Sequence, residues 1–219
     1  PELACVSAAG VSGQVFIDAN EDGALQAGET GVAGATVNLL DTTGAVYATT
    51  LTDGNGLWAF AGIPAGEWTV QVLPPDGVAL LGQIGTSGIS LTGLSDTLTL
   101  SGQDITGLSA AATAACTLEV NVFIDANTNG ERGTYERRLS GVTLEAIRVL
   151  EDQEVVIATL STNEEGEAVF STLAPGTYKL RATLPDGYGF GKKGKEIRAT
   201  SSIMEMSSEL VQVSQEFTV

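Results

Sequence analysis

An internal repeat constrains the fold of this chain more than any other feature. Residues 15–20 read VFIDAN and recur unchanged at residues 122–127, an offset of 107 (122 − 15). Residues 75–77, PDG, recur at residues 185–187, an offset of 110 (185 − 75). Each offset is the size of one small domain, so the 219 residues are expected to form two homologous domains in tandem.

The pattern of polar and apolar residues predicts strands. In residues 67–73, Trp68, Val70 and Val72 alternate with polar residues, and residues 177–183 repeat this alternation. Further β-branched runs lie between Gly, Asp, Asn or Pro turns, at residues 35–40, 45–52, 97–101, 143–149 and 210–219. No run has a convincing helical period with caps, and 27 glycines favour many turns. We therefore predict an all-β fold of two tandem immunoglobulin-like β-sandwich domains.

The junction between the domains is expected in a stretch of small residues. Residues 109–115 read SAAATAA, show no apolar alternation, and precede a strand-like run at residues 117–125. The predicted domains accordingly span residues 1–111 and 112–219.

The net charge of the chain limits the classes of partner that it can bind. There are 27 acidic and 10 basic residues, a net charge of −17, which repels nucleic acids and anionic membrane surfaces and favours divalent cations. The first basic residue is Arg132, so the first repeat has no cationic side chain among its carboxylates. No apolar run reaches the roughly 20 residues of a membrane helix, so no membrane insertion is expected. Pro1 does not open a signal peptide, which suggests an interior piece of a longer protein.

The absence of histidine argues against an enzyme. Without it the chain lacks the commonest general base, the commonest zinc ligand and every Ser-His or Cys-His pair. Carboxylate pairs for glycoside hydrolysis always occur among 27 acids, but loop ligands and exposed faces account for most of them. Cys5 and Cys116 form no CxxC motif, and whether they pair is left open.

One loop in the first repeat carries a metal-binding pattern. Residues 18–29 read DANEDGALQAGE and fit the EF-hand calcium loop D-x-[DN]-x-[DN]-G-x5-E at every fixed position. Such a loop aims three side-chain oxygens, one backbone carbonyl and a closing bidentate Glu at one centre, and these hard donors select Ca2+. The predicted ligands are Asp18, Asn20, Asp22, Ala24 through its carbonyl, and Glu29.

The second repeat carries the same pattern, in residues 125–136. Its predicted calcium ligands are Asp125, Asn127, Asn129, Glu131 through its carbonyl, and Glu136. Each loop follows an expected strand and not the helix of an EF-hand. Because Asn129 stands where the first loop has an acid, calcium is expected to bind more weakly at the second loop.

The alternative is that both loops are ordinary turns without metal, since Asp, Asn and Gly also dominate turns. Glu29 and Glu136 argue against it, because a turn has no evident need for these carboxylates. A second acidic turn contains Asp53, which is either an extra oxygen donor or part of a plain hairpin. The equivalent residue in the second repeat is Asn163.

The aromatic residues are interpreted as core and not as a carbohydrate-stacking platform. Trp68 and Tyr178 lie on the apolar faces of matched runs, and Trp58 and Tyr47 are assigned with them. The basic, aromatic and glycine-rich run at residues 187–195 is expected to be an exposed hairpin loop, with a protein-contact role as the alternative.

The sequence resembles a known family over most of both repeats. Residues 15–44 and 52–77 contain the strand, the DxNxDG loop, GExGVAG, TDxxGxWxF and PxGxW, and they closely resemble the B-type repeats of serine-aspartate-repeat adhesins. The resemblance implies a Cna-B-type, prealbumin-like sandwich that binds calcium through the residues named above. Related domains often carry a Lys–Asn isopeptide bond, which residues 1–115 cannot form because they contain no lysine.

The resemblance also implies a role. It indicates a calcium-stiffened stalk that contacts neighbouring domains of the same surface protein, in an extracellular position on a Gram-positive cell wall. The main alternative is an adhesive or carbohydrate-binding module that contacts a host or substrate ligand directly. A transthyretin-like hydrolase is disfavoured, because that chemistry relies on the histidine this chain lacks.

Overall fold

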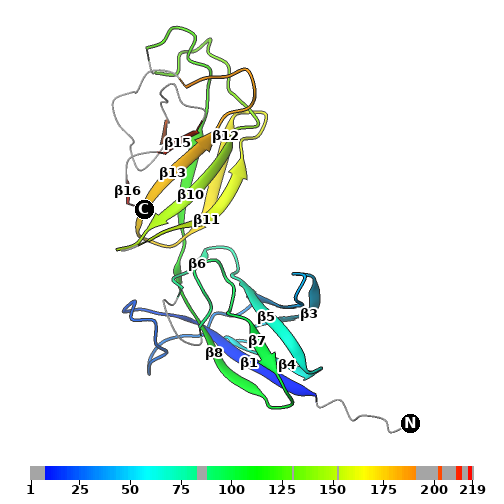
Figure 1. Cartoon of the computed structure of the whole chain (residues 1–219). Helices are drawn as coiled ribbons and strands as arrows, with labels where there is room; N and C mark the ends of the chain where they lie inside the picture. Colours follow the sequence, from blue (N-terminus) through cyan, green and yellow to red (C-terminus); the bar gives the residue numbers. More distant parts are fainter. Residues whose placement is uncertain are drawn as a thin grey trace, which may run out of the picture. The chain divides into compact units, whose positions relative to one another are not determined.

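The computed structural model describes residues 8–82, 88–129, 131–151 and 153–190, and the backbone of three short strands beyond them. The chain divides into two compact units, residues 1–115 and 116–219 (Figure 1). The described residues form strands and turns and contain no helix, so the predicted all-β class is confirmed. None of these residues forms an apolar helix that could cross a membrane.

The first domain is a sandwich of two four-stranded sheets. One sheet has the order β4-β1-β8-β6 and the other β3-β2-β5-β7. Strands β1 and β8 run parallel, with Val15 opposite Ala110, and the other pairs are antiparallel. The strands are β1 (Ala9–Ile17), β2 (Thr36–Leu40), β3 (Val46–Leu51), β4 (Leu57–Ile63), β5 (Gly66–Leu73), β6 (Val78–Leu80), β7 (Leu98–Leu100) and β8 (Ile105–Ala114).

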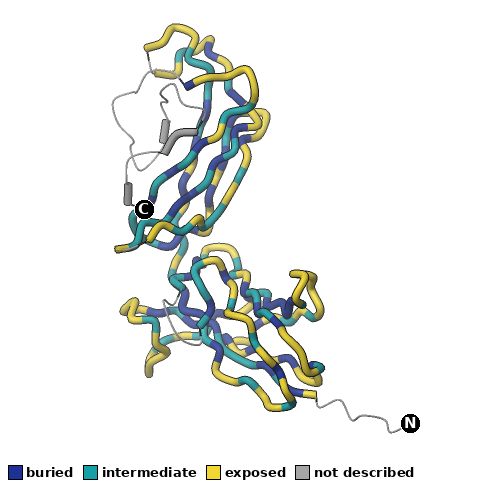
Figure 2. The backbone as a smooth tube through the Cα atoms, viewed as in Figure 1, coloured by how far each residue is buried: buried dark blue, intermediate teal, exposed yellow. Residues whose placement is uncertain are grey.

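The core of the first domain lies between its two sheets. Alternate residues of β5 are buried, namely Trp68, Val70 and Val72, as the sequence predicts, and they pack with Val11 and Val15 of β1 in one cluster. Figure 2 shows the same alternation of buried and more exposed residues along the strands. Burial of apolar surface, at about 25 cal/mol per Å2, therefore holds the two sheets together.

The second domain repeats this arrangement. Its sheets have the orders β11-β10-β13-β15, with β16 also paired to β13, and β12-β9-β14. Strand β14 runs parallel to β9 as β8 does to β1. The strands are β9 (Cys116–Asn121), β10 (Thr143–Val149), β11 (Glu154–Ser161), β12 (Glu167–Leu173), β13 (Thr177–Thr183), β14 (Ser202–Ile203), β15 (Val211–Val213) and β16 (Phe217–Thr218). Strands β10 and β13 have the bounds predicted for them.

The junction expected in the stretch of residues 109–115 lies at its end, after Ala115, but the stretch itself is not a linker. Nearly all of it belongs to β8, which pairs with β1 from Val11 to Ile17, and Ala110, Ala111 and Ala112 are buried. Small side chains suit this position because β8 lies next to β1 inside the packed sandwich. The structure accordingly divides the chain after Ala115, whereas the predicted boundary at residues 111 and 112 lies inside a strand.

The aromatic residues follow the predicted core positions with one exception. Trp58, Trp68 and Tyr178 are buried. Tyr47 is 53% exposed, and its ring lies on that of Trp68 with centroids 4.6 Å apart, so its assignment to the core is wrong. Cys116 has a free thiol at the start of β9, and Cys5 lies outside the described residues. Most of the run at residues 187–195 also lies outside them.

Candidate calcium-binding loops

The first loop, residues 18–29, leaves the end of β1 and is anchored at both ends. Asp18 N donates to Ala112 O at 2.9 Å, and Ile17 N donates to Thr30 O at 2.8 Å. Val32 N then donates to Val15 O at 2.8 Å, which returns the chain to β1. Most of the loop between these anchors is exposed (Figure 2). The core therefore fixes the base of the loop while its tip remains open to solvent ions.

Inside this loop the predicted side chains bond to the loop's own backbone. Asp18 Oδ2 accepts Gly23 N at 2.7 Å, and Asp22 Oδ1 accepts Ala24 N at 2.9 Å. Asn20 Nδ2 donates to Asp22 Oδ2 at 3.0 Å. These contacts tie the side chains at positions 1, 3 and 5 to one another and to the backbone of the loop.

Glu29 closes the first loop. Its Oε1 accepts Ala19 N at 3.1 Å and its Oε2 accepts Gln26 N at 2.8 Å. The carboxylate thus links the beginning of the loop to its end without a metal. The sequence argument that a turn has no need for this acid is therefore wrong, although each carboxylate oxygen keeps a further lone pair for a cation.

The carboxylate of Asp18 is the group in this loop that most needs a positively charged partner. The residue is only 2% exposed, and its Oδ1 accepts no hydrogen bond from any described group. A buried carboxylate oxygen without a partner is strongly unfavourable. Residues 1–115 contain no Lys, Arg or His that could approach it. The donor set of this loop therefore fits a bound cation.

The second loop has the same hydrogen-bonding frame. Glu136 is buried, its Oε1 accepts Ala126 N at 3.0 Å, and its Oε2 accepts Gly133 N at 2.8 Å. Asp125 Oδ1 accepts Asn129 N at 3.2 Å. Position 4 is left-handed in both loops, with φ of 59° at Glu21 and 56° at Thr128. The backbone of the two loops is therefore shaped alike, with Gly130 outside the described residues.

The complete ligand set remains a prediction. Among the described residues, no three acidic side chains gather into a ready metal cluster. An EF-hand-type loop also uses amide and backbone oxygens, here those of Asn20, Asn127, Asn129, Ala24 and Glu131, and Asn129 Oδ1 accepts Glu131 N at 2.8 Å.

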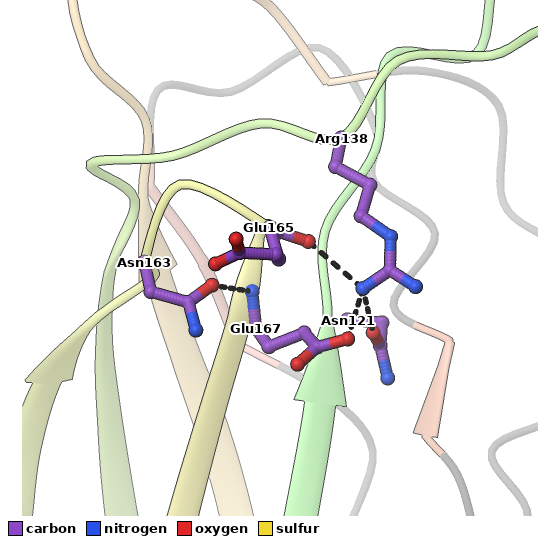
Figure 3. Close-up of polar contacts among 5 residues, drawn as sticks. All are labelled: Asn121, Arg138, Asn163, Glu165 and Glu167. Carbon is purple, nitrogen blue, oxygen red and sulfur yellow. Dashed lines mark hydrogen bonds and ion pairs between the residues drawn. The ribbon is translucent and has the colours of Figure 1, made fainter.

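Asp53 caps the turn between β3 and β4. Its Oδ1 accepts Asn55 N at 2.8 Å and Leu57 N at 2.9 Å. Asn163 holds the equivalent turn in the second domain, where its Oδ1 accepts Glu167 N at 2.8 Å (Figure 3). Because an amide serves as well as the carboxylate, the turn itself explains Asp53. Its role as an extra calcium ligand remains a prediction.

Sequence reasoning missed a cluster around Arg138, just after the second loop (Figure 3). Arg138 Nη1 donates to Glu165 O at 2.9 Å and to Asn121 Oδ1 at 3.2 Å, and it forms an ion pair with Glu167 Oε1. The confinement of basic residues to position 132 and beyond was the available signal.

A groove of about 660 Å3 lies over β1, β4 and β8 of the first domain, beside the first loop. Leu25 and Leu57 line it and are 46% and 49% exposed. Trp58 also lines it but is 4% exposed, so its ring offers little surface for stacking a sugar.

Comparison with known proteins gives consistent matches. Residues 9–110 and 117–217 each match the SdrD B-like domain family. Serine-aspartate repeat-containing protein D of Staphylococcus aureus (strain Newman) is 33% identical over 178 residues, 80% of this chain and 13% of that protein. Serine-aspartate repeat-containing protein C of the same strain is 30% identical over 177 residues, 79% of this chain and 18% of that protein. The chain thus spans less than a fifth of either relative.

Solved structures resemble the chain more distantly. A Streptococcal ancillary pilin is 15% identical, with a TM-score of 0.36, over 94% of this chain and 63% of its own. The shaft pilin SpaA from Lactobacillus rhamnosus GG is 14% identical, with a TM-score of 0.34, over 92% of this chain and 98% of its own. These scores are too low to bear on the fold, which rests on the strand pairing described above. Since the family matches both units almost completely, the chain belongs to the SdrD B-like domain family and contains two tandem copies of that domain.

Proposed function

We propose that this chain is a calcium-stabilised stalk segment of an extracellular bacterial cell-surface adhesin, without enzymatic activity. The observation that carries the calcium part is the buried Oδ1 of Asp18, which accepts no hydrogen bond from the part of the chain that the structure describes, in a domain without any basic side chain. This oxygen lies in a loop whose pattern recurs in the second domain.

Each loop would hold one calcium ion with its own set of oxygens. Bound calcium supplies the positive charge that offsets the loop carboxylates. In the first domain the ligands are the side chains of Asp18, Asn20, Asp22 and Glu29 with the carbonyl of Ala24. In the second they are those of Asp125, Asn127, Asn129 and Glu136 with the carbonyl of Glu131. The hydrogen bonds of Glu29 and Glu136 hold both ends of each loop near the cation in advance, which lowers the ordering cost of binding.

Family membership supports the stalk. Two copies of one domain, each with a core of its own, form a repeating unit suited to spacing. The relatives are serine-aspartate repeat-containing proteins many times longer than this chain, so neighbouring domains of one surface protein are the proposed partners. The same relationship supports the proposed position on the cell wall.

Thermal unfolding of the whole fragment tests this proposal. Melts are recorded with calcium in excess and then with EGTA, and a magnesium melt serves as the control. At a hundredfold excess over Kd, calcium binding adds about 2.7 kcal/mol. For domains of this size that corresponds to a rise of about 10 °C in Tm. Equal midpoints in calcium and EGTA would mean that the loops are plain turns.

A second candidate is an adhesive module, and the groove beside the first loop is the observation that favours it. Its exposed Leu25 and Leu57 could contact an apolar part of a host or substrate ligand. Binding of the fragment to a glycan or host-protein array, abolished by Leu57→Glu but not by Val169→Glu at another exposed strand position, would support this candidate. If the fragment binds nothing on either array, the adhesive candidate fails and only the stalk proposal remains.

A further inference from the structure

The two loops end in the same backbone frame but with different residues. Ile17 N donates to Thr30 O at 2.8 Å, and Ile124 N donates to Arg137 O at 2.7 Å. The next residue forms an isolated β-bridge in both cases, Gly31 to Phe16 of β1 and Arg138 to Phe123, which lies just after β9. At one and the same place, therefore, one domain has no side chain and the other has an arginine.

In the first domain this place is filled by the neighbouring hairpin turn. A Cβ on Gly31 would lie 2.0 Å from both the carbonyl carbon and the oxygen of Asn55. That oxygen accepts Gln14 Nε2 at 2.9 Å. The turn thus packs directly on the loop exit, through neutral groups alone.

In the second domain the arginine occupies this place and joins three segments. Arg138 belongs to the loop exit, Asn121 ends β9, and Glu165 and Glu167 belong to the turn and to β12 (Figure 3). The carbonyl it caps, Glu165 O, is the counterpart of Asn55 O. The Arg138 side chain is 31% exposed, so its hydrogen bonds are partly shielded from water.

The two domains also differ in net charge, and the first is the more negative. Residues 1–115 contain 11 acidic and no basic residues, a formal charge of −11. Residues 116–219 contain 16 acidic and 10 basic residues, a formal charge of −6 (10 − 16). Ion pairs join Arg138 to Glu167, Lys179 to Glu154, and Arg181 to Glu145 in the second domain. The first domain has no basic side chain of its own to offset its acids.

We propose that Arg138 is a positioning residue that takes over in the second domain the part played by calcium in the first. It ties the exit of the second loop to the neighbouring hairpin, so the second domain keeps its fold when calcium is withdrawn. The first domain, in which Asp18 Oδ1 accepts no hydrogen bond from the described residues and no side chain is basic, loosens under the same conditions. This inference rests on the proposed function, because it concerns how each domain depends on the bound ion.

The whole chain offers separate signals for the two domains. Its two tryptophans, Trp58 and Trp68, are both buried in the first domain, so a red shift of tryptophan emission reports that domain alone. Hydrogen exchange followed by mass spectrometry reports the amides of β9, β10 and β12 in the second. On addition of EGTA, the tryptophan signal is expected to move to a clearly lower melting temperature, while exchange in β9, β10 and β12 accelerates much less.

Arg138→Gln in the whole chain tests the role of the arginine itself. In EGTA this variant should exchange the amides of β9 and β12 about tenfold faster, the effect of losing a charge-assisted hydrogen bond. Calcium should restore the protection. The control is Arg181→Gln, which removes an ion pair of similar exposure between β13 and β10. It should show no calcium-dependent change.

The outcomes separate the two proposals. Equal loss of protection in Arg138→Gln with and without calcium would show a merely structural role and overturn the inference. Equal calcium dependence of both domains in the unmodified chain would also overturn it, while leaving calcium stabilisation intact. If neither the tryptophan signal nor the exchange responds to calcium, the proposed function fails.

Discussion

Replacing Asp18 by Asn should change the stability of the first domain in opposite directions with and without calcium. The amide keeps an oxygen that can accept the bond from Gly23 N, now 2.7 Å from Asp18 Oδ2. It removes a buried charge whose second oxygen accepts no hydrogen bond from the described residues. In EGTA we therefore expect no loss of stability, or a gain of about 1 kcal/mol, because removing an uncompensated buried charge is favourable.

With calcium the effect reverses. The unmodified domain gains about 2.7 kcal/mol at a hundredfold excess of calcium over Kd, and the Asp18→Asn variant forfeits most of that gain with its charged ligand. The midpoint of the first domain in calcium should therefore fall by about 10 °C relative to the unmodified chain. Tryptophan emission during a thermal melt measures this, since Trp58 and Trp68 both lie in that domain.

Asp53→Asn is the matched control. The same replacement already exists in the second domain, where Asn163 holds the equivalent turn. We expect the Asp53 variant to keep its calcium response, and a reduced response would identify Asp53 as a ligand. The reasoning about Asp18 is refuted if Asp18→Asn lowers the midpoint equally in calcium and in EGTA, because the carboxylate would then serve only the bond to Gly23.

Three further predictions concern packing and ionisation. Gly31→Ala should lower the free energy of unfolding of the first domain by about 2 kcal/mol in calorimetry, because its Cβ would meet the Asn55 backbone. Gly54→Ala should change this free energy little, because a Cβ there would meet open space. Tyr178→Phe should destabilise the second domain alone by about 1 kcal/mol in denaturant titration, because Tyr178 OH donates to Ala174 O at 2.8 Å. Burial raises the pKa of Tyr178 despite nearby Arg148, so the unfolded phenol ionises first. Second-domain stability should therefore decline above about pH 10, and Tyr178→Phe should remove that decline in pH-dependent melts.

The repeat and the alternation of residues were enough to predict the domain number, the all-β class and most strands. Trp68, Val70 and Val72 show why, because in a strand neighbouring side chains face opposite ways, and a buried face is written into the local order of residues. The positions of both candidate loops were likewise evident, since ligand spacing within a loop is a local property of the chain.

Contacts between distant segments decided the rest. Alanines at 110–112 carry no pattern of their own, and they form a strand because β1, far away in the sequence, pairs with them. The closing bonds of Glu29, the orphaned oxygen of Asp18 and the three acceptors around Arg138 likewise depend on which backbone groups the folded chain brings within hydrogen-bond distance. Sequence order alone does not specify these distances, because they result from the packing of two sheets whose strands lie far apart along the chain.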